Sequence, residues 1–156
     1  MFFYDDVSFI KQGWVNRNRI LVNGKDFLFS VPQEKISSYT QIKDSLISKK
    51  NYEVWKNKFL QTLEQSYKKS PHYDLVITLI VSVLNKNFST ISELAIDSAI
   101  SISKYLGLNT KFIISSEKYK NQEMERAARL IDICKQEGAD EYLNAIGGME
   151  LYSKEE

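Results

Sequence analysis

The sequence predicts an α/β fold, layered from a parallel core sheet, an added β-hairpin and about four helices. Three observations carry this class. Short apolar runs at residues 1–5 and 111–114 have the length of buried strands. An Asn-Gly dipeptide separates two further apolar runs. Longer segments repeat apolar residues at helical spacing, and a strand–helix–strand order near the C-terminus implies parallel strands with a right-handed crossover.

The first expected elements are a strand and a hairpin. The strand, residues 1–5, ends at two acids. Asn23 and Gly24 predict a type I′ turn, because both central residues of that turn need positive φ. The second arm of the hairpin ends at Pro32, and the polar residues 33–50 are expected to form a loop.

Helices follow the loop. Large apolar residues recur every four positions from Trp55 to Tyr67, which is typical of an amphipathic helix. Pro71 separates this helix from a second apolar stripe that begins at Tyr73. Two amphipathic helices in succession are therefore expected, and each should bury one face.

The C-terminal half is expected to contain two further helices and two strands. Thr90 and Glu93 have the spacing of a capping box and mark the start of the third helix. After the strand at 111–114, a fourth helix is expected over residues 122–137 and a final strand over 141–144. The predicted core face of the fourth helix is Ala127, Leu130, Ile131 and Cys134.

Composition excludes several classes of function. The chain has 156 residues, enough for one domain with a core, and a net charge of +1, which gives no overall field for nucleic acid or an anionic membrane. Cys134 and His72 are single, so multi-cysteine zinc sites, internal disulfides and most histidine chemistry are excluded. The longest apolar run, residues 75–84, is too short to cross a bilayer as a helix. A cytoplasmic protein without membrane insertion is expected, and no metal site is assigned.

Polar residues stand where the predicted parallel strands end, and ligands of α/β sheets bind beyond those ends. They are Asp5 and Asp6 after the first strand, Ser115 and Ser116 after the second, and Asn144, Gly147 and Gly148 after the third. The functional interpretation makes Asp5, Asp6 or Lys11 catalytic, an aspartate acting as general base or metal ligand, and makes the others ligand-binding. Turns and helix caps are the structural alternatives.

The segment after the first strand is rich in planar hydrogen-bonding groups: Trp14, Asn16, Arg17, Asn18 and Arg19. On a strand, this alternation puts both arginines on one face and both asparagines on the other. Guanidinium groups match phosphate or carboxylate with paired hydrogen bonds, and an indole can stack on a base or sugar. The segment therefore suits a nucleotide or nucleotide sugar. A solvated strand edge with ion pairs, and a packed indole, are the alternatives.

The stretch "FYDDVSFIKQGWVNRNRI", followed by "NG" and "LFSVP", resembles the central signature of the WbqC-like family. Later stretches agree in order: "EQSYKKSPHYD", "ISKYLGLNTKFIISSE" and "ICKQEGADEYLNAIGGMELY". The resemblance covers nearly the whole chain. The residues that match the signature are Asp5, Asp6, Lys11, Trp14, Asn16, Arg17, Asn18, Arg19, Ser116, Glu117, Gly138, Tyr142, Gly147 and Gly148.

Family members are bacterial proteins associated with O-antigen, lipopolysaccharide and other surface-polysaccharide gene sets. The resemblance therefore implies cytoplasmic work on a sugar or nucleotide-sugar precursor, and we favour a group-transfer enzyme. It carries over no cofactor and no catalytic residue set. A homodimer stays open, and nucleic acid is not an expected partner.

Two alternatives to that function stay open. A nucleotidyl- or adenylyl-transferring α/β enzyme would consume ATP and release pyrophosphate. A non-catalytic accessory protein of polysaccharide assembly would carry an exposed apolar patch.

Family members also usually begin with an additional strand and a Gln-Pro-containing segment and close with a further strand. Residues 1–156 are therefore expected to form a single α/β domain that is incomplete at both ends.

Overall fold

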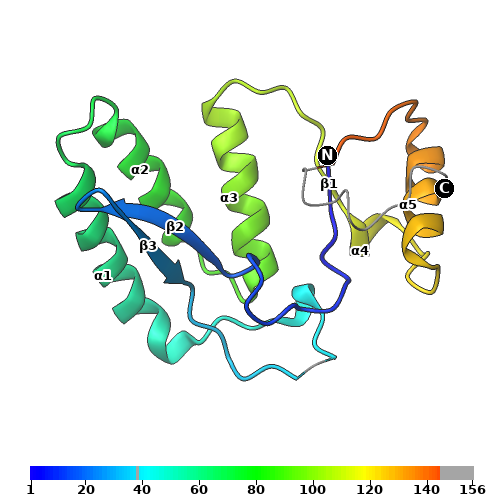
Figure 1. Cartoon of the computed structure of the whole chain (residues 1–156), viewed down its shortest axis with the longest axis horizontal. Helices are drawn as coiled ribbons and strands as arrows, with labels where there is room; N and C mark the ends of the chain where they lie inside the picture. The colour runs from blue at the N-terminus through cyan, green and yellow to red at the C-terminus, as the bar shows by residue number, and fades with distance from the viewer. Residues whose placement is uncertain (38, 145–156) are drawn as a thin grey trace. The chain divides into compact units, whose positions relative to one another are not determined.

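The structure, a computed structural model, describes residues 1–37 and 39–144 (Figure 1). Its contacts divide the chain into two compact units, Met1–Ser115 and Ser116–Glu156, which are described separately. Helices are combined with a parallel strand pair and an antiparallel hairpin, so the predicted α/β class is confirmed. The expectation of a single domain over residues 1–156 stays a prediction.

The hairpin of the first unit is formed as the Asn-Gly dipeptide predicts. β2 (Arg17–Val22) pairs antiparallel with β3 (Lys25–Ser30). The two turn residues have positive φ, 51° at Asn23 and 72° at Gly24. This is the left-handed conformation that a type I′ turn requires, and its twist matches that of the flanking strands.

The parallel sheet of the first unit is small. β1 (Phe2–Phe3) pairs in parallel with β4 (Ile113–Ile114), and each strand has two residues. The strands expected at residues 1–5 and 111–114 therefore exist, but in shortened form. Their carboxyl ends lie side by side, as the sequence interpretation required of them.

The prediction of a third parallel strand at residues 141–144 is wrong. This segment has no strand structure, and its four residues are exposed. Leu143 is 83% exposed, so the segment has no large buried side chain to hold it against a sheet. The parallel pair therefore consists of β1 and β4, the first and last strands of the first unit. The predicted strand–helix–strand unit, in which the strand at 111–114 would pair with one at 141–144, does not form.

Three long helices complete the first unit: α1 (Lys49–Tyr67), α2 (Tyr73–Leu84) and α3 (Ile91–Tyr105). The segment before α1 is a loop, as predicted, apart from isolated bridges and the short 3₁₀ helix η1 (Ile42–Asp44). His72 is exposed at the N-cap position of α2. Within the described ranges, none of the helices has both the length and the apolar composition needed to span a bilayer.

The start of α3 carries the predicted capping box. The backbone N–H of Glu93 donates to Thr90 Oγ1 at 3.2 Å, and the backbone N–H of Thr90 donates to Glu93 Oε2 at 3.1 Å. These bonds satisfy two donors that a helix N-terminus otherwise leaves unpaired. Beyond the other end of α3, Gly107 has a φ of 69°, the left-handed conformation that commonly ends a helix.

The core of the first unit lies between the hairpin and the three helices. Two aromatic contacts attach the hairpin to α1: the ring of Phe29 lies 4.5 Å from that of Phe59 and 6.5 Å from that of Trp55. Such pairs contribute beyond the area that they bury. The buried cluster consists of Val31, Ile47, Val83, Leu84, Ile91 and Leu94.

The second unit, within the described residues, contains one long helix. α4 (Ser115–Lys118) begins at the boundary of the units, and α5 (Arg126–Glu137) follows. α5 starts four residues later than predicted, because the backbone N–H of Met124 donates to the carbonyl of Asn121 in a turn. It ends as predicted at Gly138, which has a φ of 61°.

The buried face of α5 differs from the predicted one. Leu130 and Ile133 are buried, whereas Ile131 is 43% exposed, so its place on the core face is wrong. The buried face includes Arg129, which is 5% exposed. A pattern of apolar residues cannot include a guanidinium group, so the prediction was centred one residue position away from the true face.

Candidate functional site

Trp14 is the centre of a basic cluster at the start of the hairpin. The guanidinium carbons of Arg17 and Arg19 lie 5.7 Å and 5.0 Å from the centre of its ring. Arg17 and Arg19 point to the same face of β2, as the alternation predicts. The indole is 59% exposed. Trp14, Arg17 and Arg19 are called the Trp-Arg cluster below.

Local bonds fix the two guanidinium groups in different ways. Arg17 Nε donates to the carbonyl of Gly13 at 2.7 Å, which leaves its two terminal nitrogens without a hydrogen-bond partner among the described residues. Arg19 forms a surface ion pair with Asp26 at 3.1 Å. Two terminal N–H groups on one guanidinium are the donors that a phosphate or carboxylate accepts in a bidentate contact.

The two asparagines of the segment have structural bonds. Asn16 Nδ2 donates to the carbonyl of Val31 at 3.0 Å, and the N–H of Val31 donates to the carbonyl of Asn16 at 2.7 Å. Asn18 Oδ1 accepts from the backbone N–H of Arg19 at 2.8 Å. The amide groups therefore hold the backbone that carries the arginines.

A groove of about 440 Å³ opens beside the Trp-Arg cluster, within the range of small-molecule sites. All five residues of the predicted basic segment, Trp14, Asn16, Arg17, Asn18 and Arg19, lie on its lining. The rest of the lining is almost wholly apolar. It consists of Val15, Ile20, Phe29, Val31, Trp55, Phe59, Leu63, Leu79, Ile80, Val83, Leu84, Ile91, Leu94, Ala95, Ser98 and Ile102.

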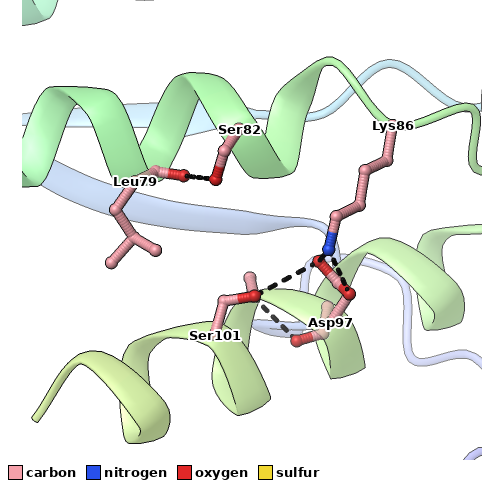
Figure 2. A network of polar contacts seen from close by, with 7 residues as sticks. Leu79, Ser82, Lys86, Asp97 and Ser101 are labelled. Carbon is pink, nitrogen blue, oxygen red and sulfur yellow. Dashed lines mark hydrogen bonds and ion pairs between the residues drawn. The ribbon is translucent and has the colours of Figure 1, made fainter.

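The groove's helical walls are held by polar contacts at their edges. Figure 2 shows Lys86, which follows α2, reaching Asp97 on α3: both carboxylate oxygens lie 2.7 Å from Lys86 Nζ. Ser101 Oγ donates to the same carboxylate at 3.4 Å. On α1, Tyr52 Oη donates to the carbonyl of Leu84 at 3.0 Å. Burial, and then the charge of the neighbouring glutamate, raise the pKa of Tyr52, so this donor keeps its proton.

The candidate catalytic residues are in two environments. Asp5 and Asp6 follow β1 and are 5% and 4% exposed, and neither lines the groove. Lys11 is exposed and lines a second hollow of about 420 Å³, whose lining also includes Asn16 and Arg17. Lys11 is therefore the candidate that shares a hollow with the basic segment.

The other candidates come from the sheet end and the second unit. Ser115 is fully buried directly after β4, and Ser116 is half-buried. Because β1 and β4 are parallel neighbours, Ser115 and Asp5 follow the same edge of the sheet. Asn144 is exposed in the second unit. Gly147 and Gly148 lie outside the described residues. Among the described residues, no three His, Cys, Asp or Glu side chains are grouped so that they could hold a metal ion.

Sequence reasoning missed two groups of polar residues. One is the Lys86–Asp97 pair, for which only the helical i, i+4 spacing of Asp97 and Ser101 gave a signal. The other is a network around Arg129 in the second unit: Arg129 Nε donates to Asn121 Oδ1 at 3.0 Å, and Asn121 Nδ2 donates to Asp132 Oδ2 at 2.7 Å. Nothing in the sequence marks Arg129 as buried.

Comparison with known proteins relates this chain to a family. Over 146 residues it is 27% identical to the uncharacterized protein Rv1507c of Mycobacterium tuberculosis, with 90% of this chain and 60% of that protein covered. The chain thus spans about 60% of the length of this relative. No solved structure matches it significantly. The match to the WbqC-like protein family extends over residues 1–156, and the chain therefore belongs to that family.

Proposed function

We propose that the chain is a group-transfer enzyme of bacterial O-antigen or surface-polysaccharide biosynthesis, acting in the cytoplasm on a sugar or nucleotide-sugar precursor. The observation that carries the proposal is the Trp-Arg cluster at the edge of a groove large enough for a small molecule. The comparisons give membership of the WbqC-like family. The activity and the substrate class are what we propose.

The chemistry of the cluster favours an anionic ligand with a planar or ring-shaped part. The terminal nitrogens of Arg17 are two donors on a rigid fork, which matches two oxygens of one phosphate. The exposed face of Trp14 offers a stacking surface beside them. Arg19 adds a second positive charge, and its ion pair with Asp26 is exposed and therefore weak enough to exchange for a ligand.

Within this proposal, Lys11 is the favoured catalytic residue. It shares a hollow with Arg17, so a ligand held by Arg17 can lie near the Lys11 amine. The buried carboxylates of Asp5 and Asp6 would act on a group that reaches the end of β1. Substitution of Lys11 should then lower turnover more than ligand affinity.

The proposal is tested by ligand binding in a Trp55→Phe background, in which the fluorescence of Trp14 is the sole tryptophan signal. The ligands are a nucleotide sugar, a sugar 1-phosphate and ATP. Arg17→Ala should weaken binding of the first two at least roughly tenfold, because a charged hydrogen bond is lost. Lys25→Ala is the matched control, since Lys25 is exposed on the same hairpin and does not line the groove.

The outcomes of that experiment separate the candidate functions. Equal affinity in Arg17→Ala and the parent would contradict the assignment of the site. Binding of ATP with release of pyrophosphate would favour nucleotidyl transfer instead. Circular dichroism of each variant shows whether a loss of binding comes from the site or from the fold.

A specific observation also favours a non-catalytic accessory protein. Leu21, Phe27 and Leu28 on the hairpin are large apolar residues that are exposed, as are Leu106 and Leu108 after α3. Exposed apolar groups of this kind mark interaction surfaces in many proteins. Co-purification with a glycosyltransferase that Leu21→Ser and Leu28→Ser abolish, combined with no binding of any phosphate ligand, would support this function over the first.

A further inference from the structure

A second cavity, distinct from the hollow that Lys11 lines, lies next to the groove in the first unit. Its volume is about 340 Å³, and its surface is almost entirely apolar. It lies where the end of α1 meets the start of α2, under β2. The lining consists of Ile20, Leu63, Tyr67, Ser70, Pro71, His72, Tyr73, Val76, Ile77 and Ile80.

Three apolar side chains line both the groove and this second cavity: Ile20 from β2, Leu63 from α1 and Ile80 from α2. The groove and the second cavity are therefore neighbours, and these three side chains form part of the wall that they share. Aliphatic side chains change rotamer far more easily than helices move. A ligand that fills the floor of the groove can extend past this wall into the second cavity.

The polar and apolar parts of the groove lie at separate places. Charged groups are confined to the Trp-Arg cluster, and the floor is formed by side chains such as Val83, Leu84 and Leu94. A sugar pressed onto that floor would lose the hydration of its hydroxyl groups without gaining hydrogen bonds, which is unfavourable. A hydrocarbon chain on the same floor is favoured by its transfer out of water.

We propose that the groove binds its precursor as an anionic amphiphile, in which a phosphate or pyrophosphate joins the sugar to a hydrocarbon or acyl chain. The phosphate binds to Arg17 and Arg19, and the chain lies along the apolar floor and reaches the second cavity beside Val76. This inference rests on the proposed function, because it specifies the class of ligand for the same site. It adds a length-selective compartment that the proposed function alone does not contain.

A series of n-alkyl phosphates from ethyl to decyl tests the inference, with each compound kept below its micelle concentration. The unsubstituted full chain is used, binding is measured by calorimetry, and a nucleotide sugar is the reference ligand. Each added methylene should tighten binding roughly twofold to fourfold until the cavities are full, as expected for burial of a CH₂ group. The n-alkanols of the same lengths should bind much more weakly, because they lack the phosphate.

Two variants separate the two ends of the ligand. Val76→Phe fills the second cavity, so the gain in affinity should stop at a shorter chain while ethyl phosphate is unaffected. Val54→Phe is the matched control, because Val54 is exposed on α1 and lines neither hollow. Arg17→Ala should weaken all alkyl phosphates by the same factor and leave the dependence on chain length unchanged.

The failure of this inference differs from the failure of the proposed function. Binding of the nucleotide sugar together with alkyl phosphates whose affinity does not depend on length would overturn the inference alone. No binding of either ligand would overturn both. A length dependence that Val76→Phe and Arg17→Ala leave unchanged would also overturn it, since the chain would then bind elsewhere, for example between two copies of the protein.

Discussion

Arginines occur in opposite environments in the two units. Arg129 on α5 is 5% exposed, and its Nε donates to Asn121, which in turn donates to Asp132. Arg19 on β2 has a side chain that is 56% exposed, and its contacts are an indole face and one surface carboxylate. The first guanidinium is buried, and the second faces solvent.

The difference distinguishes arginines that stabilise the fold from arginines that can bind a ligand. A buried guanidinium has lost its hydration, so it depends on its protein partners and cannot be removed without cost. An exposed guanidinium retains water that an anion can replace. The comparison therefore predicts that polar groups of this protein contribute to stability in order of burial, and four measurements test that order.

The largest effect is expected for Arg129→Ala. Loss of the guanidinium leaves Asn121 Oδ1 without its donor and removes the packing of the aliphatic stem, which should lower the stability of α5 by about 2–3 kcal/mol. Hydrogen exchange of the α5 amides measures this, because it reports on local opening. Lys135→Ala on the exposed side of the same helix is the control and should change exchange by less than about 0.5 kcal/mol. Equal changes in amide exchange for the two variants would contradict the expectation that a buried side chain contributes more to stability than an exposed one.

Tyr52→Phe should lower the free energy of unfolding by about 1 kcal/mol at neutral pH, because the bond to the Leu84 carbonyl is lost. Burial, with a smaller contribution from Glu53, raises the pKa of Tyr52 above its ordinary value of 10.0. The folded state thus holds this proton more tightly than the unfolded state. The resulting stability is complete below pH 10 and is lost as the pH rises above it. Urea unfolding between pH 9 and 11 should show a smaller decline in Tyr52→Phe than in the parent.

The Lys86–Asp97 pair should have an intermediate effect. Both side chains are partly exposed, so their coupling free energy should be about 0.5–1 kcal/mol and should fall with added salt. A double-mutant cycle with Lys86→Met and Asp97→Asn, followed by urea unfolding, measures it. A coupling that salt leaves unchanged would mean that the pair is more enclosed than the exposed fractions of its two side chains indicate.

The smallest effect on stability is expected for Arg19→Ala. It removes one surface ion pair and one contact with an exposed ring, which together should contribute about 0.5 kcal/mol or less. Thermal unfolding checks the stability, and Trp14 emission in a Trp55→Phe background reports the lost contact. A loss above about 2 kcal/mol would show that the Trp-Arg cluster stabilises the fold, and the case for a binding role would fail.

The parts that sequence predicted well follow local rules. Asn23 and Gly24 determine a turn through their own φ angles, and Thr90 with Glu93 determines a helix start through bonds within four residues. The shared face of Arg17 and Arg19 followed from strand alternation alone. Each of these features depends on residues that are close in the chain.

The parts that sequence missed depend on tertiary contacts. The groove has apolar walls from three helices and a hairpin, and no local pattern shows how those faces meet. The surroundings of Asp5 likewise depend on a distant segment, because the backbone N–H of Lys43 donates to the carbonyl of Asp5 at 2.7 Å. The strand expected at 141–144 failed for a related reason, since a strand needs a partner edge that a short apolar run cannot supply by itself.

The two-residue turn of the hairpin determines more than a change of chain direction. Pairing through Asn23 and Gly24 places Arg17 opposite Ser30 and Asn18 opposite Phe29. A slip of β2 by a single position would reverse its two faces, so that Arg17 and Arg19 would exchange sides of the hairpin with Asn18 and Ile20. Two residues that do not line the groove thus decide on which side of the hairpin an anion can bind.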